Sequence, residues 1–143
     1  MSYRFIEELT LADVAFEADG STLEELFASA GLALNATQVG NIGEIQHKES
    51  RPFDLTFKAV DMLLFNFLQD IIYWKDVDQI LFGSFDLSIQ KEEGAYHLTG
   101  AGRGERIDPA RHHLLVDVKA VTMHKFEVTG GLNGWKATVV LDI

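Results

Sequence analysis

The sequence of 143 residues contains no cysteine, which excludes disulfide bonds and thiolate metal sites. It also lacks a long hydrophobic run. The most apolar stretch, residues 60–74, is interrupted by Asp61, Asn66, Gln69 and Asp70, whereas a membrane-spanning helix needs about 20 nearly continuous apolar residues. The N-terminus has no apolar segment of the kind found in secretory signals. These absences predict a cytoplasmic protein that does not enter a membrane.

The usual catalytic motifs are absent as well. There is no P-loop, no nucleophile elbow and no zinc-binding His-Glu-x-x-His helix. Residues 100–104 are glycine-rich, but they lack the spacing of a dinucleotide-binding loop and are typical of a turn after a strand. His112 and His113 are adjacent, so on a strand they would point to opposite faces, and the other histidines are scattered. Neither a zinc site nor an enzyme class is therefore indicated, and a metal-dependent hydrolase would also need an activated water and a proton acceptor.

Basic residues are scarce relative to acidic ones. Twelve lysines and arginines stand against 22 aspartates and glutamates, which gives a formal net charge of −10. A surface this negative repels a phosphate backbone, so tight binding of nucleic acid is not expected. The charge suits a basic protein surface or a cation, or it serves solubility alone.

Hydrophobic periodicity predicts two helices and several strands. Residues 21–24 match a capping box and begin a helix that runs into the mid-thirties. A second helix begins near Asp61 and is apolar almost all round, which predicts a central buried helix. A single helical turn is predicted from Asp108. Strands are predicted over residues 3–9, 13–19, 44–58 (one bent strand or two), 79–91, 95–102, 116–128 and 135–143. We predict one α+β domain over residues 1–143, with a two-layer mixed β-sheet packed on two helices.

The end of the chain concentrates carboxylate oxygens. Asp142 stands immediately before the terminal residue Ile143, whose α-carboxylate adds a second acidic group. Calcium, magnesium and manganese prefer such hard oxygen ligands. Asp13, which opens a predicted strand beside apolar neighbours, is a candidate third ligand. The alternative is that Asp142 is simply solvated in a fraying terminus, and spacing alone leaves both interpretations open.

Five segments resemble, in order and over nearly the whole chain, the archease family. The family's opening H-T-A-D-V motif and the capped helix after it are similar to residues 10–14 and 17–25 here. Its G-E-x-x-D-P-x-R-H segment resembles residues 104–112, and its K-A-V-T-Y-H strand resembles residues 119–124. Its W-x-A…D-[IV] ending resembles residues 135–143. The chain departs from these motifs at Thr10, Leu11 and Met123.

The resemblance implies a compact mixed sheet on two helices and a divalent metal site. The family's metal ligands correspond here to Asp13, Asp142 and Ile143, with calcium the expected ion and manganese or magnesium suited to the same oxygens. The resemblance also implies a non-enzymatic activator of an RtcB-type RNA ligase in tRNA splicing or RNA repair, which promotes ligase guanylylation and multiple turnover. Contact with that partner is expected at residues of the matched segments and their surroundings: His124, Lys119 and Arg103. The alternative is a chaperone-like protein-binding module unrelated to RNA ligation.

Overall fold

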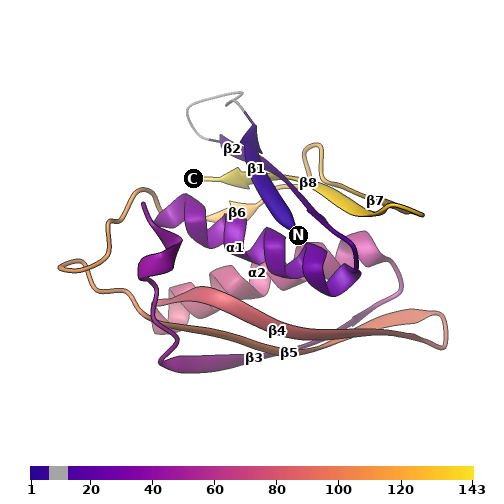
Figure 1. The fold of residues 1–143 in the computed structure, drawn as a ribbon, viewed down its shortest axis with the longest axis horizontal. Coiled ribbons are helices and arrows are strands. Elements are labelled where there is room, and N and C mark those ends of the chain that lie inside the picture. The colour runs from indigo at the N-terminus through magenta and orange to yellow at the C-terminus, as the bar shows by residue number, and fades with distance from the viewer. Residues whose placement is uncertain (7–12) are drawn as a thin grey trace.

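The computed structural model describes residues 1–6 and 13–143, which form two sheets with two α-helices between them (Figure 1). The first part of the chain gives β1 (Ser2–Ile6), β2 (Asp13–Gly20), α1 (Leu23–Gln38), the 3₁₀ helix η1 (Ile42–Glu44), β3 (Glu49–Phe57) and α2 (Val60–Asp78). The second part gives β4 (Ile80–Glu92), β5 (Ala95–Arg106), β6 (Ala120–Val121), β7 (Glu127–Gly131) and β8 (Gly134–Asp142).

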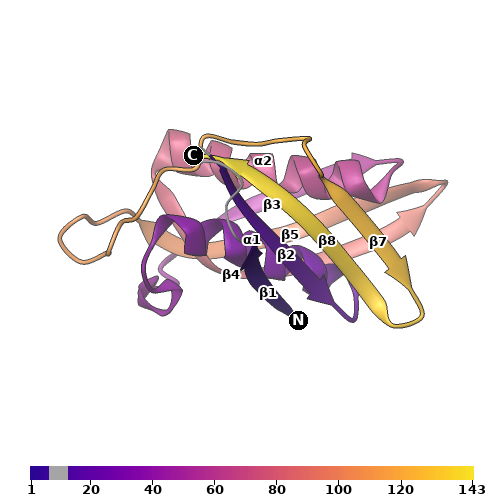
Figure 2. The ribbon, with the colours of Figure 1, turned by 90° about the horizontal axis from the view of Figure 1, so that it is seen from above.

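The strands form a five-stranded and a three-stranded sheet. The first has the order β1-β2-β8-β6, with β7 also paired to β8, and the second has the order β3-β5-β4. Every pairing in both sheets is antiparallel. The α+β class and the two helices are confirmed. The expected single mixed sheet is instead two antiparallel sheets, so the helices form the central of three layers (Figures 1 and 2).

The central position of the helices follows from their apolar surfaces. In α2 the side chains of Leu63, Leu64, Phe67 and Leu68 are all fully buried. The helix contacts β3, β4 and β5 of one sheet and β6 and β7 of the other. Phe67 packs on Phe53 of β3 with ring centroids 5.0 Å apart. Within the described residues, no helix is both long and apolar enough to cross a membrane.

Helix α1 begins one residue later than the capping box predicted. Thr22, not Ser21, is the N-cap, and its hydroxyl accepts a hydrogen bond from the Glu25 amide at 3.1 Å. The Glu25 carboxylate accepts in turn from the Ser21 amide at 3.0 Å. The helix continues through Gly31, where the Phe85 ring lies so close that an added Cβ would stand 2.6 Å from it.

The strand predicted over residues 116–128 is wrong in extent, because only β6 and β7 are extended there and a turn containing Lys125 at φ 55° separates them. The strand predicted over residues 3–9 begins as β1, and its residues 7–9 lie outside the described residues. Pro52 lies in β3, an edge strand, where a residue without an amide hydrogen is tolerated.

Candidate metal site at the end of β8

Two of the three predicted metal ligands are brought together by strand register. In the antiparallel β2–β8 pair, Asp13 lies directly opposite Asp142. Residues directly opposite each other project from the same face, with Cβ atoms about 4.5–5.5 Å apart. Phe16 and Ala18 of β2 are buried toward the helices, so the alternation along the strand places both aspartates on the outer face of the sheet.

The third predicted ligand, Ile143, directly follows Asp142 in the chain. Ile143 is half-buried, and its side chain packs against the core, so the terminal carboxylate is held beside Asp142. The main chain of Asp142 is also held from the other side, because Ala120 of β6 pairs with it and the Lys119 amide donates to its carbonyl at 2.8 Å. Figure 2 shows the C-terminus beside the start of β2.

The chemistry of this group fits a hard divalent cation. Asp13 and Asp142 supply carboxylate oxygens on one face, and the Ile143 α-carboxylate adds a third acidic group. Among the described residues, no cluster of three or more His, Cys, Asp or Glu side chains is placed to hold a metal ion. An ion at this edge would therefore depend on the main-chain carboxylate of Ile143 as well as on the two aspartates.

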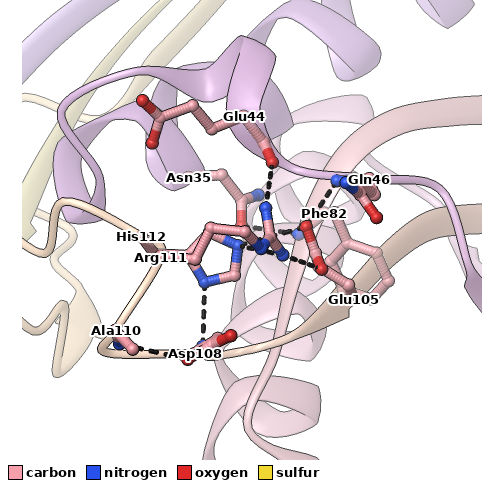
Figure 3. Close-up of polar contacts among 9 residues, drawn as sticks. All are labelled: Asn35, Glu44, Gln46, Phe82, Glu105, Asp108, Ala110, Arg111 and His112. Carbon is pink, nitrogen blue, oxygen red and sulfur yellow. Dashed lines mark hydrogen bonds and ion pairs between the residues drawn. The ribbon is translucent and has the colours of Figure 1, made fainter.

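A second polar group surrounds the buried Glu105 near the end of β5 (Figure 3). Its carboxylate accepts hydrogen bonds from the Arg111 guanidinium, from the Gln46 amide at 2.6 Å and from His112 Nε2 at 3.1 Å. Arg111 also donates to the Glu44 carbonyl at 2.9 Å. The group therefore ties the segment after β5 to the segment that follows η1.

The hydrogen bonds around His112 define its tautomer. The Asp108 amide donates to His112 Nδ1 at 2.8 Å, so that nitrogen carries no hydrogen and Nε2 is the donor to Glu105. Burial alone would raise the pKa of Glu105, but the hydrogen bonds from Arg111, Gln46 and His112 outweigh it and lower the pKa to about 2. The hydrogen bond between Arg111 and Glu105 raises the pKa of Arg111 above its ordinary value. This is a structural ion pair in which the Glu105 carboxylate is buried while the Arg111 side chain is partly exposed.

Comparison with known proteins covers almost the whole chain. A sequence profile of the Archease protein family (MTH1598/TM1083) matches residues 3–143. An archease of Methanosarcina acetivorans is 34% identical over 142 residues, which cover 99% of this chain and 95% of that protein. The chain belongs to the archease family. The family resemblance described from the sequence motifs is thereby confirmed.

Solved structures support the same assignment. The solution structure of protein 1598 of Methanobacterium thermoautotrophicum is 32% identical to this chain, with a TM-score of 0.85 and coverage of 99% of this chain and 98% of that one. A crystal structure of an archease from Thermotoga maritima, described as a possible chaperone, has a TM-score of 0.58 at 18% identity and covers 94% of this chain and 93% of that one. The latter shows similarity of fold alone.

The residues expected at the partner contact do not form one surface. Lys119 is exposed beside the paired end of β8, and His124 is exposed in the turn between β6 and β7. Arg103 is exposed in β5, which belongs to the other sheet, so the helical layer lies between it and the candidate metal site (Figure 1). Lys119 and His124 thus remain candidates for a surface around the aspartate pair, while Arg103 is not brought to it.

Of the departures from the family motifs, Met123 alone lies within the described residues. Thr10 and Leu11 lie outside the described residues, and Met123 is exposed in the connection after β6. The Glu105 group, by contrast, was missed from the sequence. Its signal was the Gly-Glu-x-x-Asp-Pro-x-Arg-His segment of the archease resemblance, in which Asp108 closes the predicted helical turn by accepting from the His112 amide at 2.7 Å.

Proposed function

We propose that this archease-family protein is a non-enzymatic activator of an RtcB-type RNA ligase in tRNA splicing or RNA repair. It would promote guanylylation of the ligase and multiple turnover through a metal-binding acidic tip, which we define as Asp13, Asp142 and the Ile143 carboxylate. The observation that carries the proposal is the register that sets Asp13 opposite Asp142 at the very end of the chain. The family membership supports it, since the resemblance implied this role.

The acidic tip would hold a divalent cation, with calcium the expected ion and manganese or magnesium suited to the same oxygens. A bound cation supplies charge neutralisation for phosphate oxygens, which is the main requirement of nucleotidyl transfer. The residues of this chain fix where that charge is presented. The Ile143 side chain anchors the terminus in the core, and the Lys119 amide holds the Asp142 main chain.

The charge of the chain favours a protein partner over direct RNA binding. The formal net charge is −10, which repels nucleic acid and attracts the basic surfaces that an RNA-binding enzyme presents. The ligase would therefore bind the RNA, and the acidic tip would approach the ligase.

The experiment compares tip variants in RNA ligation by the ligase from the same cell. Removal of Asp142 and Ile143 should abolish stimulation and calcium binding. The single change Asp142→Asn should abolish stimulation and lower calcium affinity at least about ten-fold, and the circular dichroism spectrum should be retained in both. Glu127→Gln, which changes an exposed carboxylate of β7 in the same sheet, should stimulate normally. Normal stimulation by the truncated protein would show that the acidic tip plays no part.

A second candidate is the chaperone-like protein-binding module. It is favoured by an exposed apolar run, Leu114, Leu115 and Val116, in the connection between β5 and β6. Suppression of aggregation of an unfolded test protein, without any effect on ligation, would select this candidate.

A further inference from the structure

The connection between β5 and β6 exposes three consecutive apolar side chains. Leu114, Leu115 and Val116 are 43%, 53% and 41% exposed. The main chain that carries them is nevertheless fastened to the end of α1. The Leu115 amide donates to the Gln38 carbonyl at 2.9 Å, and Leu114 forms an isolated bridge with Val39. The apolar side chains are therefore presented to solvent by a fixed backbone.

A pocket opens beneath this run. Its volume is about 230 Å³, and it is lined by the exposed run together with Leu81, Ile107, Gln38, Lys75 and Asp117. Sites for small molecules usually measure about 300–1,000 Å³. The pocket is smaller than that range, so it suits one large apolar side chain together with the main chain that carries it.

Gln38 lines the pocket and is itself buried. The residue is 4% exposed, and its Oε1 accepts from the Val118 amide at 3.3 Å, which fixes the orientation of the side-chain amide. The Nε2 group has no hydrogen-bond partner. That nitrogen is itself closed to solvent, so a bound segment does not reach it, and the pocket offers an incoming side chain mainly apolar contacts.

The charges at the rim are predominantly negative. Lys75 is buried, and its Nζ donates to Asp117 Oδ1 at 2.5 Å and lies 3.5 Å from Asp76. The Asp117 and Asp76 side chains are 69% and 62% exposed, so two carboxylates face solvent around one buried ammonium. The formal net charge of −10 has the same sign. A basic segment therefore complements this rim.

We propose that this pocket docks a segment of a basic protein. A leucine, phenylalanine or methionine side chain of that segment enters beside Leu81, Ile107 and Leu115. Flanking lysines or arginines lie against Asp76 and Asp117. This surface is separate from the acidic tip, and the inference holds whether or not the partner is an RNA ligase.

The test uses the full chain labelled for NMR and a short acetylated and amidated peptide. The peptide carries leucine and phenylalanine between two pairs of lysines. Two control peptides replace the apolar pair by serines or the lysines by glutamates. The lysine peptide should cause saturable shifts of the Gln38 side-chain amide and of the Leu114, Leu115 and Val116 methyl groups. Both control peptides should bind at least ten-fold more weakly, because one lacks the apolar side chains and the other lacks the positive charges.

Variants then locate the binding. Leu115→Ser should weaken the peptide at least about ten-fold, because burial of a leucine side chain contributes about 1.5–3 kcal/mol. Val116→Ser provides a second variant should the first not fold. Leu132→Ser, which removes an equally apolar and fully exposed side chain in the turn between β7 and β8, should bind as the wild type does.

Three results would overturn the proposal. One is equal binding of the glutamate peptide, and another is an unchanged affinity in both serine variants of the exposed run. The third is movement of the same resonances with protein concentration alone, which would identify a second copy of this chain as the occupant. Stimulation of the ligase does not enter this test, so it can fail or succeed independently of the proposed function.

Discussion

The ion pair around Glu105 should make the stability of the protein depend on pH in an acidic range. The pKa of Glu105 is about 2 in the folded protein, against an ordinary value of 4.5. At about 1.36 kcal/mol per pKa unit, the difference corresponds to about 3 kcal/mol of folding free energy. Because the folded pKa is the lower one, this contribution is complete above pH 4.5 and is lost as the pH falls from 4.5 toward 2.

The change Glu105→Gln tests this reasoning directly. In urea unfolding at pH 7, the variant should have a free energy of unfolding about 3 kcal/mol below that of the wild type. The difference should shrink steadily when the same pair is compared below pH 4.5. Glu127→Gln, at an exposed position of β7, should match the wild type throughout. A deficit that stays constant from pH 7 to pH 3, or no deficit at pH 7, would refute the account of the ion pair.

Three further predictions concern the tip and the core. Asp13→Asn and Asp142→Asn should each lower calcium affinity at least about ten-fold in titration calorimetry, since each removes a charged ligand; unchanged affinity in both would place the ion elsewhere. Asn35→Ala should lower the free energy of unfolding by about 2 kcal/mol in urea, because Asn35 is fully buried and its side chain bonds the main chain of β4 and α1 at 3.0 and 2.8 Å. A loss below about 0.5 kcal/mol would contradict that role. Gly31→Ala should cost about 1–3 kcal/mol in the same assay, since its Cβ would meet the Phe85 ring, and a stabilised variant would show that the ring moves freely.

Local patterns in the sequence predicted closely where the two helices begin. The pattern of apolar residues placed α2 close to its observed start at Val60. The cap of α1 was misplaced by one residue, because Ser21 and Thr22 are both good caps followed by glutamates at the required spacing. The choice between them is made by the Ser21 amide, which bonds to Glu25 rather than to Glu24.

Pairing between distant segments was beyond the same signals. The sequence does not show that two separate sheets cover the apolar α2, because the apolar pattern of a helix does not specify which strands pack against it. The candidate metal site shows the same limit. The acidic ending was visible, but the register that sets Asp13 opposite Asp142 depends on the pairing of residues far apart in the chain.

The Glu105 group was missed for a further reason. The adjacency of His112 and His113 predicted only that the two rings do not share an ion, and it gave no partner for His112. Its partner is a carboxylate seven residues earlier, held in place by an amide of another segment. No short spacing pattern in a sequence identifies such a hydrogen-bond network. Only the resemblance of this segment to the archease family distinguished it from other segments.

The central claim is that the protein activates an RNA ligase, and labelled GTP tests it most directly. The ligase from the same cell would be incubated with labelled GTP and a divalent metal, with and without a substoichiometric amount of this protein. The account predicts that each molecule of this protein accelerates the guanylylation of many ligase molecules, and that the Asp142→Asn variant does not. An unchanged rate of guanylylation, with the ligase active and this protein folded, would contradict it.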